Sequence, residues 1–232
     1  QRLYDYANTV LSEYDKLKKE IDMIRASEEG TVELLVAYDI LRYLTPDCIL
    51  EFQKKYPNVT FSYMEYPDRI VEKMLLDKEG NVALSIGPFA GDCFDMKSLK
   101  KCSLGLLVYE GHSLAKKREA TILDLEGEPL YLENSSFKLN EFIQSRCWNR
   151  GFEPDIVFET NGFDLCYKMC RLKRGISVTI DFVHEDMNTE GLVMIPFAED
   201  DMIWEIGLLT LKDRTMESSV EKFYKYIEKY NS

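Results

Sequence analysis

Apolar residues recur at two spacings along this chain, and after Gly30 the two spacings alternate. Strict alternation of apolar and polar residues, or a short apolar run, predicts strands at 32–37, 59–63, 82–86, 104–109, 130–132, 156–159, 176–180, 192–195 and 206–211. A helical spacing predicts helices at 46–56, 67–77, 136–150, 164–173, 181–187 and 215–230. Strand, helix and strand in succession predict parallel strands joined by crossover helices, and therefore an α/β fold.

The run 44–59 carries the clearest helix signals. Thr45 suits the N-cap, and Pro46 suits the first helical position, where a missing N–H group costs nothing. Pro57 disfavours helical geometry at the residue before it, so the helix should end there. The apolar face that we expect to be buried consists of Ile49, Leu50, Phe52 and Tyr56. Cys48 and Gln53 should then face away from the core.

Residues 1–29 carry a heptad repeat. The apolar positions of its a/d seam are Leu3, Ala7, Val10, Tyr14, Leu17, Ile21 and Ile24. Such a seam predicts a long helix that pairs with a second copy of the chain, and the alternative is a helix packed on its own domain. We favour pairing because charged residues flank the seam. The helical pattern is already under way at Gln1, which indicates a part of a longer protein.

The acidic charge limits the partners that the chain can bind. The formal net charge is −12, and the charged residues are dispersed along the sequence. Nucleic-acid binding needs a basic surface, so we do not expect these residues to bind DNA. The sequence shows no secretory signal and no apolar run of transmembrane length, which predicts a cytoplasmic chain without a membrane partner. The six cysteines are therefore expected to be free thiols.

Candidate catalytic and metal-binding groups are few. His112 and His184 are the two histidines, and they do not stand at a metal-ligand spacing. The sequence lacks the nucleophile and phosphate-loop motifs of common enzyme classes. Cys166 and Cys170 lie four residues apart on a predicted helix, where burial explains them more simply than a redox pair. We therefore expect no enzyme activity, no metal and no cofactor.

Several short motifs, in order, resemble those of one family. They are the run 44–59, with its Leu-x-Pro start and Tyr-Pro-x-Val end, and the segments 80–86, 111–115, 123–130, 173–178 and 191–197. Together they resemble the effector-binding region of LysR-type transcriptional regulators, and residues 1–27 resemble the linker helix that pairs regulator subunits. Tyr38 and Asp39 stand where many members carry small hydroxyl residues, which leaves the class of effector open.

The resemblance implies a type 2 periplasmic-binding-protein-like fold, in which two Rossmann-like lobes face each other across a central cleft after a long N-terminal helix. Residues 1–29 would form the linker and dimerisation helix. Residues 30–104 and 205–232 would form the first lobe, and residues 105–204 the second. A small effector, either a carboxylate or an amino acid, would bind between the lobes. The chain would form a homodimer or homotetramer, and DNA would be bound only through a missing N-terminal domain.

Two alternative functions share this type of fold. A free-standing solute-binding protein for transport would need export, and the heptad helix would have no role in it. A dehydratase-like enzyme would need a convergent acid/base set in the cleft, and the sequence offers none. Family members that sense peroxide place a reactive cysteine where this chain has Phe137, so a peroxide sensor is not expected.

Candidate effector-binding residues follow predicted strands or begin predicted helices, where ligands of α/β folds bind. They are Tyr38, Asp39, Thr45, Asn134, Ser135, Ser136, Thr160, Asn161, Thr179 and Asp181. Hydroxyl groups and free backbone N–H groups would suit a carboxylate, whereas Asp39 and Asp181 could meet an ammonium group. Taken singly, each Ser, Thr or Asn is explained more simply as a capping or turn residue.

Overall fold

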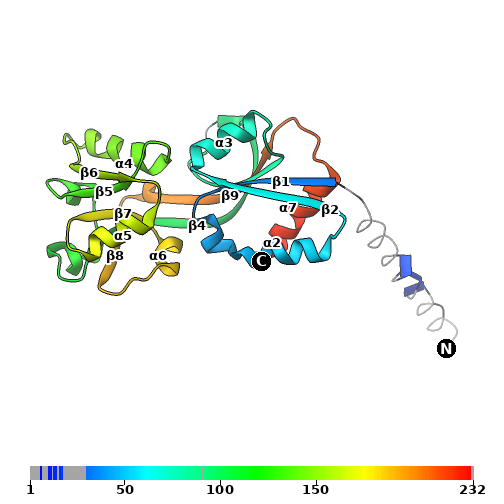
Figure 1. Ribbon diagram of the computed structural model, residues 1–232, viewed down its shortest axis with the longest axis horizontal. Coiled ribbons are helices and arrows are strands. Elements are labelled where there is room, and N and C mark those ends of the chain that lie inside the picture. Colours follow the sequence, from blue (N-terminus) through cyan, green and yellow to red (C-terminus); the bar gives the residue numbers. More distant parts are fainter. Residues whose placement is uncertain are drawn as a thin grey trace.

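The chain folds into two α/β lobes that lie side by side along the long axis of the molecule (Figure 1). The computed structural model describes residues 30–89 and 91–230, and in the N-terminal segment Tyr6, Val10, Leu11, Glu13, Tyr14, Lys16 and Leu17. The first lobe holds β1 to β3 with α2, α3 and α7, and the second holds β5 to β8 with α4 to α6. The predicted two-lobed α/β fold is confirmed.

Both lobes are built from short strands and helices in alternation. The strands are β1 (Gly30–Ala37), β2 (Val59–Tyr66), β3 (Val82–Ile86), β4 (Phe94–Tyr109), β5 (Leu130–Glu133), β6 (Ile156–Thr160), β7 (Ile176–Ile180), β8 (Leu192–Pro196) and β9 (Ile203–Leu211). The α-helices are α2 (Ile40–Lys55), α3 (Asp68–Leu76), α4 (Lys138–Asn149), α5 (Phe163–Arg171), α6 (Asp181–Asp186) and α7 (Ser218–Tyr230). Single 3₁₀ turns are η1 (Gly91–Cys93), η2 (Ser113–Lys116), η3 (Ile122–Leu125) and η4 (Asp200–Met202).

The strand order explains how two lobes arise from one chain. Strands run in the order β2-β1-β3-β9-β4-β7-β5-β6, and β8 also pairs with β4. In the first lobe β1 is parallel to both neighbours, β2 and β3. In the second lobe β5 is likewise parallel to β6 and β7. Strands β4 and β9 are antiparallel to each other and lie in the middle of the order.

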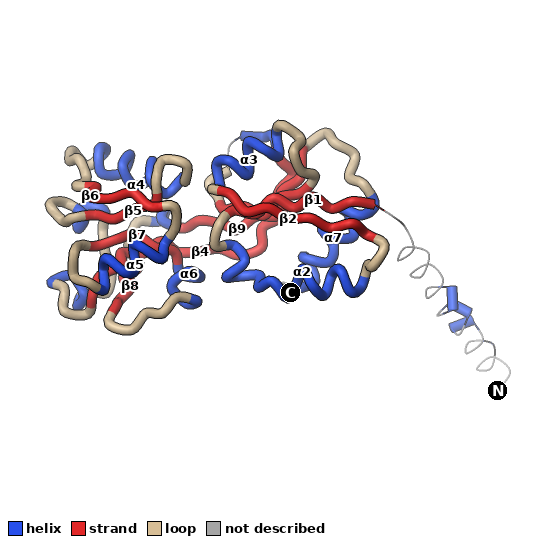
Figure 2. The backbone as a smooth tube through the Cα atoms, viewed as in Figure 1, coloured by secondary structure: helices blue, strands red, loops and turns tan. Residues whose placement is uncertain are grey.

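Strands β4 and β9 join the lobes. The 16-residue β4 pairs with β9 as far as Ser103, and from Leu104 onward it pairs with β7 and β8. The pairing register shifts between Ser98 and Lys100, which marks an irregularity in the shared ribbon. Figure 2 shows both strands passing from one lobe into the other. Two extended segments therefore cross between the lobes.

Helices cover both faces of each sheet, and large apolar side chains fill the space beneath them. In the first lobe α3 lies on one side of the strands, and α2 and α7 lie on the other (Figure 1). Phe52 of α2 is fully buried, and its ring centroid lies 5.1 Å from that of Phe223 in α7. Phe61 of β2 completes this cluster, with its centroid 5.9 Å from that of Phe52. The cluster packs the C-terminal part of α2 and α7 against β2.

Helix α2 departs from its predicted form. It begins at Ile40 rather than at residue 46, and Thr45 has φ 52° and ψ 144°, so the helix kinks one residue before Pro46. The predicted burial of Leu50 is wrong, because its side chain is 58% exposed. The predicted outward position of Cys48 is also wrong, because Cys48 is fully buried. Cys48, Ile49 and Phe52 share one face at helical spacing, and Leu50 lies off that face, so the prediction chose the wrong set of apolar positions.

The first part of β4 was not predicted. Residues 94–103 mix lysines and serines with apolar residues, and most of them are exposed or half-buried. Pairing with β9 holds this segment extended, so its strand geometry depends on a distant part of the chain and not on local pattern.

The heptad segment is described in part. Val10, Tyr14 and Leu17 are helical, and their side chains are 62%, 63% and 55% exposed. The other predicted seam residues, Leu3, Ala7, Ile21 and Ile24, lie outside the described residues. Within the described part of the chain, no helix combines the length and the apolar character needed to cross a membrane.

Candidate ligand site between the two lobes

A cavity lies between the lobes at the carboxyl ends of two parallel strands from each lobe. Ala37, Ile86, Glu133 and Ile180 are the last residues of β1, β3, β5 and β7, and all four line it. Ligands of α/β sheets bind at these ends because the loops and helix N-termini that follow the strands converge there. The cavity therefore lies where ligands of α/β folds usually bind.

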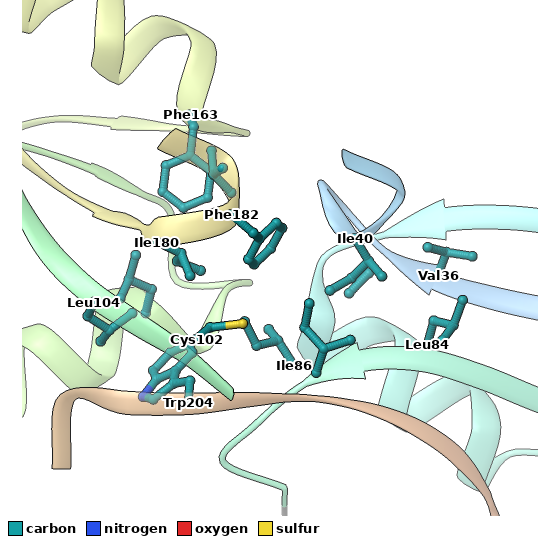
Figure 3. Packing of buried hydrophobic residues seen from close by; sticks show 14 of the residues in the cluster. Val36, Ile40, Leu84, Ile86, Cys102, Leu104, Phe163, Ile180, Phe182 and Trp204 are labelled. Atoms are coloured by element: carbon teal, nitrogen blue, oxygen red, sulfur yellow. The ribbon is translucent and has the colours of Figure 1, made fainter. Parts of the chain in front are cut away.

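Most of the cavity wall is apolar and aromatic. In Figure 3, Phe163, Ile180 and Phe182 of the second lobe face Ile40 and Ile86 of the first, with Trp204 of β9 below them. The apolar and aromatic lining consists of Ala37, Tyr38, Ile40, Ile86, Phe137, Leu139, Phe163, Ile180, Phe182 and Trp204. Such a wall excludes water and strengthens the electrostatic effect of any charged group within it.

Three carboxyl groups complete the lining of this inner cavity: Asp39, Asp68 and Glu133. Burial raises the pKa of Glu133 well above its usual value, and the charges of Asp39 and Asp68 raise it further. Burial also raises the pKa of Asp68, to about 6, against the effect of Lys138. Burial raises the pKa of Asp39 as well, although its hydrogen bond with Arg42 opposes the shift. The cavity thus gathers three carboxyl groups within an apolar wall, where burial favours their protonated forms.

A wider compartment adjoins the inner cavity on the side of α2, α5 and α6. Its lining consists of Tyr38, Asp39, Leu41, Arg42, Thr45, Pro46, Glu65, Asn161, Gly162, Asp164 and Asp186. Arg42 is at its centre, with Nε 2.5 Å from Oδ1 of Asp39 and Nη1 2.6 Å from Oδ2 of Asp186. Its Nη2 lies 3.5 Å from Oδ2 of Asp164. Arg42 therefore connects α2 of the first lobe to α5 and α6 of the second.

The two compartments differ greatly in size. The volume of the inner cavity is about 20 Å³ and that of the outer compartment about 510 Å³, both counted as the space open to the centre of a water molecule. One water molecule needs about 10–15 Å³ by this measure, so the inner cavity has room for about one. A larger ligand can enter the inner cavity only if the lobes or the lining side chains move apart.

Lys138, the first residue of α4, connects the lobes on the other side of the cavity. Its backbone N–H donates to Oδ1 of Asp68 at 3.0 Å, and its Nζ donates to the carbonyl oxygen of Ile86 at 2.7 Å. Its ammonium group also pairs with Glu72 of α3, and both side chains are at most 10% exposed. Asp68, Glu72 and Ile86 all belong to the first lobe, so one residue of the second lobe makes three polar contacts across the cleft.

Four of the predicted site residues line the compartments. Tyr38 and Asp39 line both, and Thr45 and Asn161 line the outer one. Asp39 has φ 68° and lies at the N-cap of α2, where its side chain pairs with Arg42 rather than with the helix backbone. Thr45 is exposed at the kink, and its Oγ1 lies 3.3 Å from Oη of Tyr230.

Asn134, Ser135 and Ser136 form the turn between β5 and α4, and none of them lines either compartment. Oδ1 of Asn134 accepts from the backbone N–H of Ser136 at 2.8 Å, and its Nδ2 donates to Oδ1 of Asn161 at 2.6 Å. Ser135 is exposed and Ser136 is half-buried. The structure therefore gives Asn134 a turn-forming role and links it to Asn161.

The remaining three predicted residues have structural contacts. Thr160 is buried, and its hydroxyl donates to the carbonyl of Gly162 at 2.6 Å. Thr179 is fully buried, with its hydroxyl 2.9 Å from Oη of Tyr167. Asp181 accepts from the backbone N–H of Ser103 at 2.9 Å, which fastens α6 to β4. None of the three lines the inner cavity or the outer compartment.

Sequence reasoning missed the charged residues that dominate the cleft. Glu133 directly precedes the predicted Asn134 and ends a strand, so the strand-end rule could have found it. Arg42 lies within the first turn of α2, whose start was placed too late. Asp68 and Lys138 each begin a helix, but their meeting across the cleft depends on how the lobes pack and leaves no local signal.

No cysteine lines the inner cavity or the outer compartment. All six cysteines are free; Cys93 is exposed and the other five are buried. Burial raises the pKa of Cys166 to about 11 and that of Cys170 to about 12. No group of three His, Cys, Asp or Glu residues is placed to hold a metal ion in the described part of the chain.

Two α/β lobes with a lined cavity at converging strand ends define a two-lobed ligand-binding domain. The chain belongs to the LysR substrate binding domain family, whose match covers residues 25–231. This finding confirms the family that the sequence motifs indicated.

Individual relatives agree with this assignment. The chain is 25% identical over 185 residues to the uncharacterized HTH-type transcriptional regulator YwbI of Bacillus subtilis, covering 80% of this chain and 62% of that protein. It is 23% identical over 229 residues to the transcriptional dual regulator GltC of the same organism, covering 98% of this chain and 76% of GltC. The chain thus spans less than two thirds of the length of YwbI.

Among solved structures, the BenM effector binding domain with its effector benzoate is similar. The TM-score is 0.72 at 19% identity, and the match covers 88% of this chain and 92% of that one. At this identity the likeness supports the fold and carries no information about the ligand of this chain.

Proposed function

We propose that this chain is the ligand-sensing and oligomerisation region of a LysR-type transcriptional regulator in the cytoplasm. A small effector binds between the lobes, and the chain itself catalyses no reaction. DNA is bound by a domain that is not among these 232 residues. The family membership and the regulator names of the relatives support this proposal.

One observation carries the sensing role: the cavity is enclosed by polar contacts that cross from lobe to lobe. Lys138 contacts Asp68 and Glu72 on one side, and Arg42 contacts Asp164 and Asp186 on the other. A ligand that enters the inner cavity must share this space with groups of both lobes. Occupancy therefore changes the free energy of lobe closure, which is the condition for a ligand to shift a conformational equilibrium.

The division of the chain supports the same function. We place the linker and dimerisation helix at residues 1–29, the first lobe at 30–104 and 205–232, and the second lobe at 105–204. The shared strand β4 changes partner from β9 to β7 at Leu104, which supports a boundary there. The exposed Val10, Tyr14 and Leu17 support pairing of the heptad helix with a second copy, in a homodimer or homotetramer.

Tyr38, Asp39 and Asn161 are the predicted residues best placed to touch an effector, since they line the compartments. Thr45 lies at the outer rim, and Asn134 acts through Asn161. Ser135 and Ser136 would contact a ligand only after the lobes part. Thr160, Thr179 and Asp181 support the walls from behind.

A thermal-shift screen tests this function, because a ligand that binds only the folded state raises its melting temperature. The compounds are amino acids, short organic acids, aromatic carboxylates and small amines. A positive compound should raise the melting temperature of the unaltered chain and of Tyr63→Ala, but not that of Tyr38→Ala. Tyr63 is half exposed on β2 and lines neither compartment, so it is the matched control. A shift that survives Tyr38→Ala, or no shift from any class, would contradict the proposal.

A further inference from the structure

The cleft carries far more negative than positive charge. The two compartments are lined by six carboxyl side chains, namely Asp39, Glu65, Asp68, Glu133, Asp164 and Asp186, and by one guanidinium group, that of Arg42. Asp39 belongs to both compartments and is counted once. An anion in this space lies beside acidic groups, whereas a cation is attracted by those carboxyls that are ionised. The chain as a whole has a formal net charge of −12, which acts in the same direction.

The basic groups near the cleft are already engaged. The guanidinium group of Arg42 already pairs with three carboxylates, those of Asp39, Asp164 and Asp186. The Nζ of Lys138 is held by Glu72 and by the carbonyl oxygen of Ile86. Neither group is free to receive a carboxylate ligand.

Two helix N-termini at the cleft that could serve an anion are occupied. Backbone N–H groups at a helix N-terminus form a natural anion site. At α4 the N–H of Lys138 donates to Asp68, and at α6 the N–H of Phe182 donates to Asp181 at 2.6 Å. The N-termini of α2 and α5 have no side-chain cap, but acidic side chains, those of Asp39 and Asp164, lie beside them at the outer compartment.

Glu133 is the one inner carboxyl that the protein leaves without a counter-ion. It is 4% exposed, ends β5 and lines the cavity. Within the described part of the chain its carboxyl group has no hydrogen-bond donor, and its electrostatic neighbours are the acids Asp39 and Asp68. A buried carboxylate without a partner is costly, so a site that keeps one is complete only when a ligand supplies the donor.

The rest of the inner wall suits an organic cation. Tyr38, Phe137, Phe163 and Phe182 present rings to the same cavity as Glu133. Aromatic faces attract ammonium groups and cover an apolar ligand body. Trp204 of the same lining carries a buried indole N–H without a hydrogen-bond partner among the described residues, and in Figure 3 this nitrogen is on the edge of the ring turned away from Phe182 and Ile86.

From the unpaired carboxyl of Glu133, the acidic lining and the aromatic wall, we infer that the effector of this chain is a small organic cation whose ammonium group is received by Glu133 between the lobes. This inference rests on the proposed function and names the ligand class of its site. It differs from the carboxylate that the hydroxyl-rich turns suggested from sequence. The outer acids Glu65, Asp164 and Asp186 then attract the cation to the entrance.

Calorimetric titration of the full chain at pH 7.5 tests this inference with three ligands of nearly equal size: benzylamine, benzyl alcohol and benzoate. Benzylamine, as its cation, should bind at least about tenfold more tightly than the other two, because a favourable charge contact of about 1.4 kcal/mol gives a factor of ten. Glu133→Gln, which keeps the shape of the side chain, should weaken the binding of benzylamine at least about tenfold. Glu126→Gln changes an exposed glutamate of the same lobe and should have no effect.

The outcomes separate the ligand class from the function. If benzoate binds more tightly than benzylamine, and Tyr38→Ala abolishes it, the cation inference is wrong and the effector function stands. If benzylamine binds equally well to Glu133→Gln, the assigned role of Glu133 is wrong. If none of the three ligands binds, and 1,4-diaminobutane and methylammonium also fail at millimolar concentration, the inference is overturned. Circular dichroism of each variant establishes that it is folded.

Discussion

The backbone N–H of Lys138 donates to the carboxylate of Asp68 across the cleft, at 3.0 Å from Oδ1 and 3.4 Å from Oδ2. Asp68 begins α3 in the first lobe and Lys138 begins α4 in the second, so the amino ends of two helices meet at one carboxylate. A negative charge at this place is favourable to both helix dipoles. The contact explains why Asp68 is tolerated as a buried acid.

Replacing Lys138 tests how strongly this side of the cleft holds the lobes together. Lys138→Met removes the ammonium group and leaves Glu72 buried without its partner, which should destabilise the chain by about 3–5 kcal/mol in denaturant unfolding. Small-angle scattering should show a larger radius of gyration as the lobes part. Lys116→Met, at an exposed lysine, is the control. The double variant Glu72→Met with Lys138→Met should recover most of the lost stability, and failure to recover would mean that the ion pair is not the cause.

The raised pKa values of Glu133 and Asp68 predict a stability that falls as pH rises. Below their unfolded-state pKa values both carboxyls are protonated in either state and contribute nothing. As pH rises above about 4.5 for Glu133, and from 3.8 to about 6 for Asp68, the unfolded chain loses protons that the folded chain still binds. The free energy of unfolding must therefore decrease over this range.

Glu133→Gln should remove part of this decrease in the free energy of unfolding at higher pH. The variant and the unaltered chain should have equal stability near pH 4.5, and at pH 8 the variant should be more stable by about 1–3 kcal/mol, the usual cost of an unsatisfied buried group. Urea unfolding at both pH values measures the difference. Asp39, Asp68 and Cys166 are the titratable groups that act on Glu133 from the neighbouring helices. A constant difference between the two proteins at all pH values would show that the pKa of Glu133 is the same in the folded and unfolded chain, and would contradict this prediction.

Arg42 competes with a cationic ligand for the same carboxylates. Arg42→Gln releases Asp39, so benzylamine should bind about tenfold more tightly, a gain of about 1.4 kcal/mol. Because Arg42 and Asp186 are partly exposed, the loss of stability should be small, about 1 kcal/mol. Arg174→Gln, at an exposed arginine, is the control for net charge. Weaker binding to Arg42→Gln would place Arg42 among the ligand's contacts and contradict this account.

The heptad helix should set the oligomeric state. Val10→Lys combined with Leu17→Lys places charge in the predicted seam and should raise the dissociation constant of the dimer at least about a hundredfold, since each buried apolar side chain contributes about 1.5–3 kcal/mol. Analytical ultracentrifugation measures this change. Glu13→Lys alters the charge of the same helix outside the seam and should leave the dimer intact. The melting temperature of a monomeric variant should show whether the stability of the lobes depends on pairing of the helix.

Cys93 should be the fast-reacting thiol. It is exposed, whereas burial raises the pKa of Cys48 to about 11 and that of Cys102 to about 12, which suppresses the thiolate. Titration of the folded chain with a thiol reagent should show one fast thiol, and Cys93→Ser should abolish the fast phase. A second fast thiol would contradict this prediction and would count against the expectation that the chain is not a peroxide sensor.

Local pattern was sufficient for most of the fold. Short apolar runs predicted interior strands such as 82–86, in which every residue is buried, because a strand covered on both faces needs apolar residues at nearly every position. Pattern failed at 94–103, where strand geometry is imposed by β9, at the start of α2, where the kink at Thr45 hid the first turn, and at Leu50, which lies off the buried face of the helix. Such errors arise where a distant contact or a backbone irregularity overrides local preference.

The site was predicted less well than the fold. Tyr38 and Asp39 were found because they directly follow a strand that the pattern marked clearly. Glu133 was passed over for the neighbouring hydroxyl and amide residues, since an acidic residue at a strand end is also a common surface residue. The pairing of Arg42 with Asp164 and Asp186 joins positions more than 100 residues apart, with separations of 122 and 144. No single-sequence signal reports a contact of that range.

The crossing of β4 and β9 determines what a bound effector can do mechanically. Both strands continue without interruption from one lobe to the other. Closure of the lobes therefore has to twist a two-stranded ribbon. The register irregularity between Ser98 and Lys100 is where such torsion costs least. The outer strands β2 and β6 lie at opposite ends of the strand order, so a small rotation at the ribbon becomes a larger displacement there. A ligand that binds between the lobes acts close to this ribbon, and the motion that it causes is therefore largest at the outer edges of the molecule.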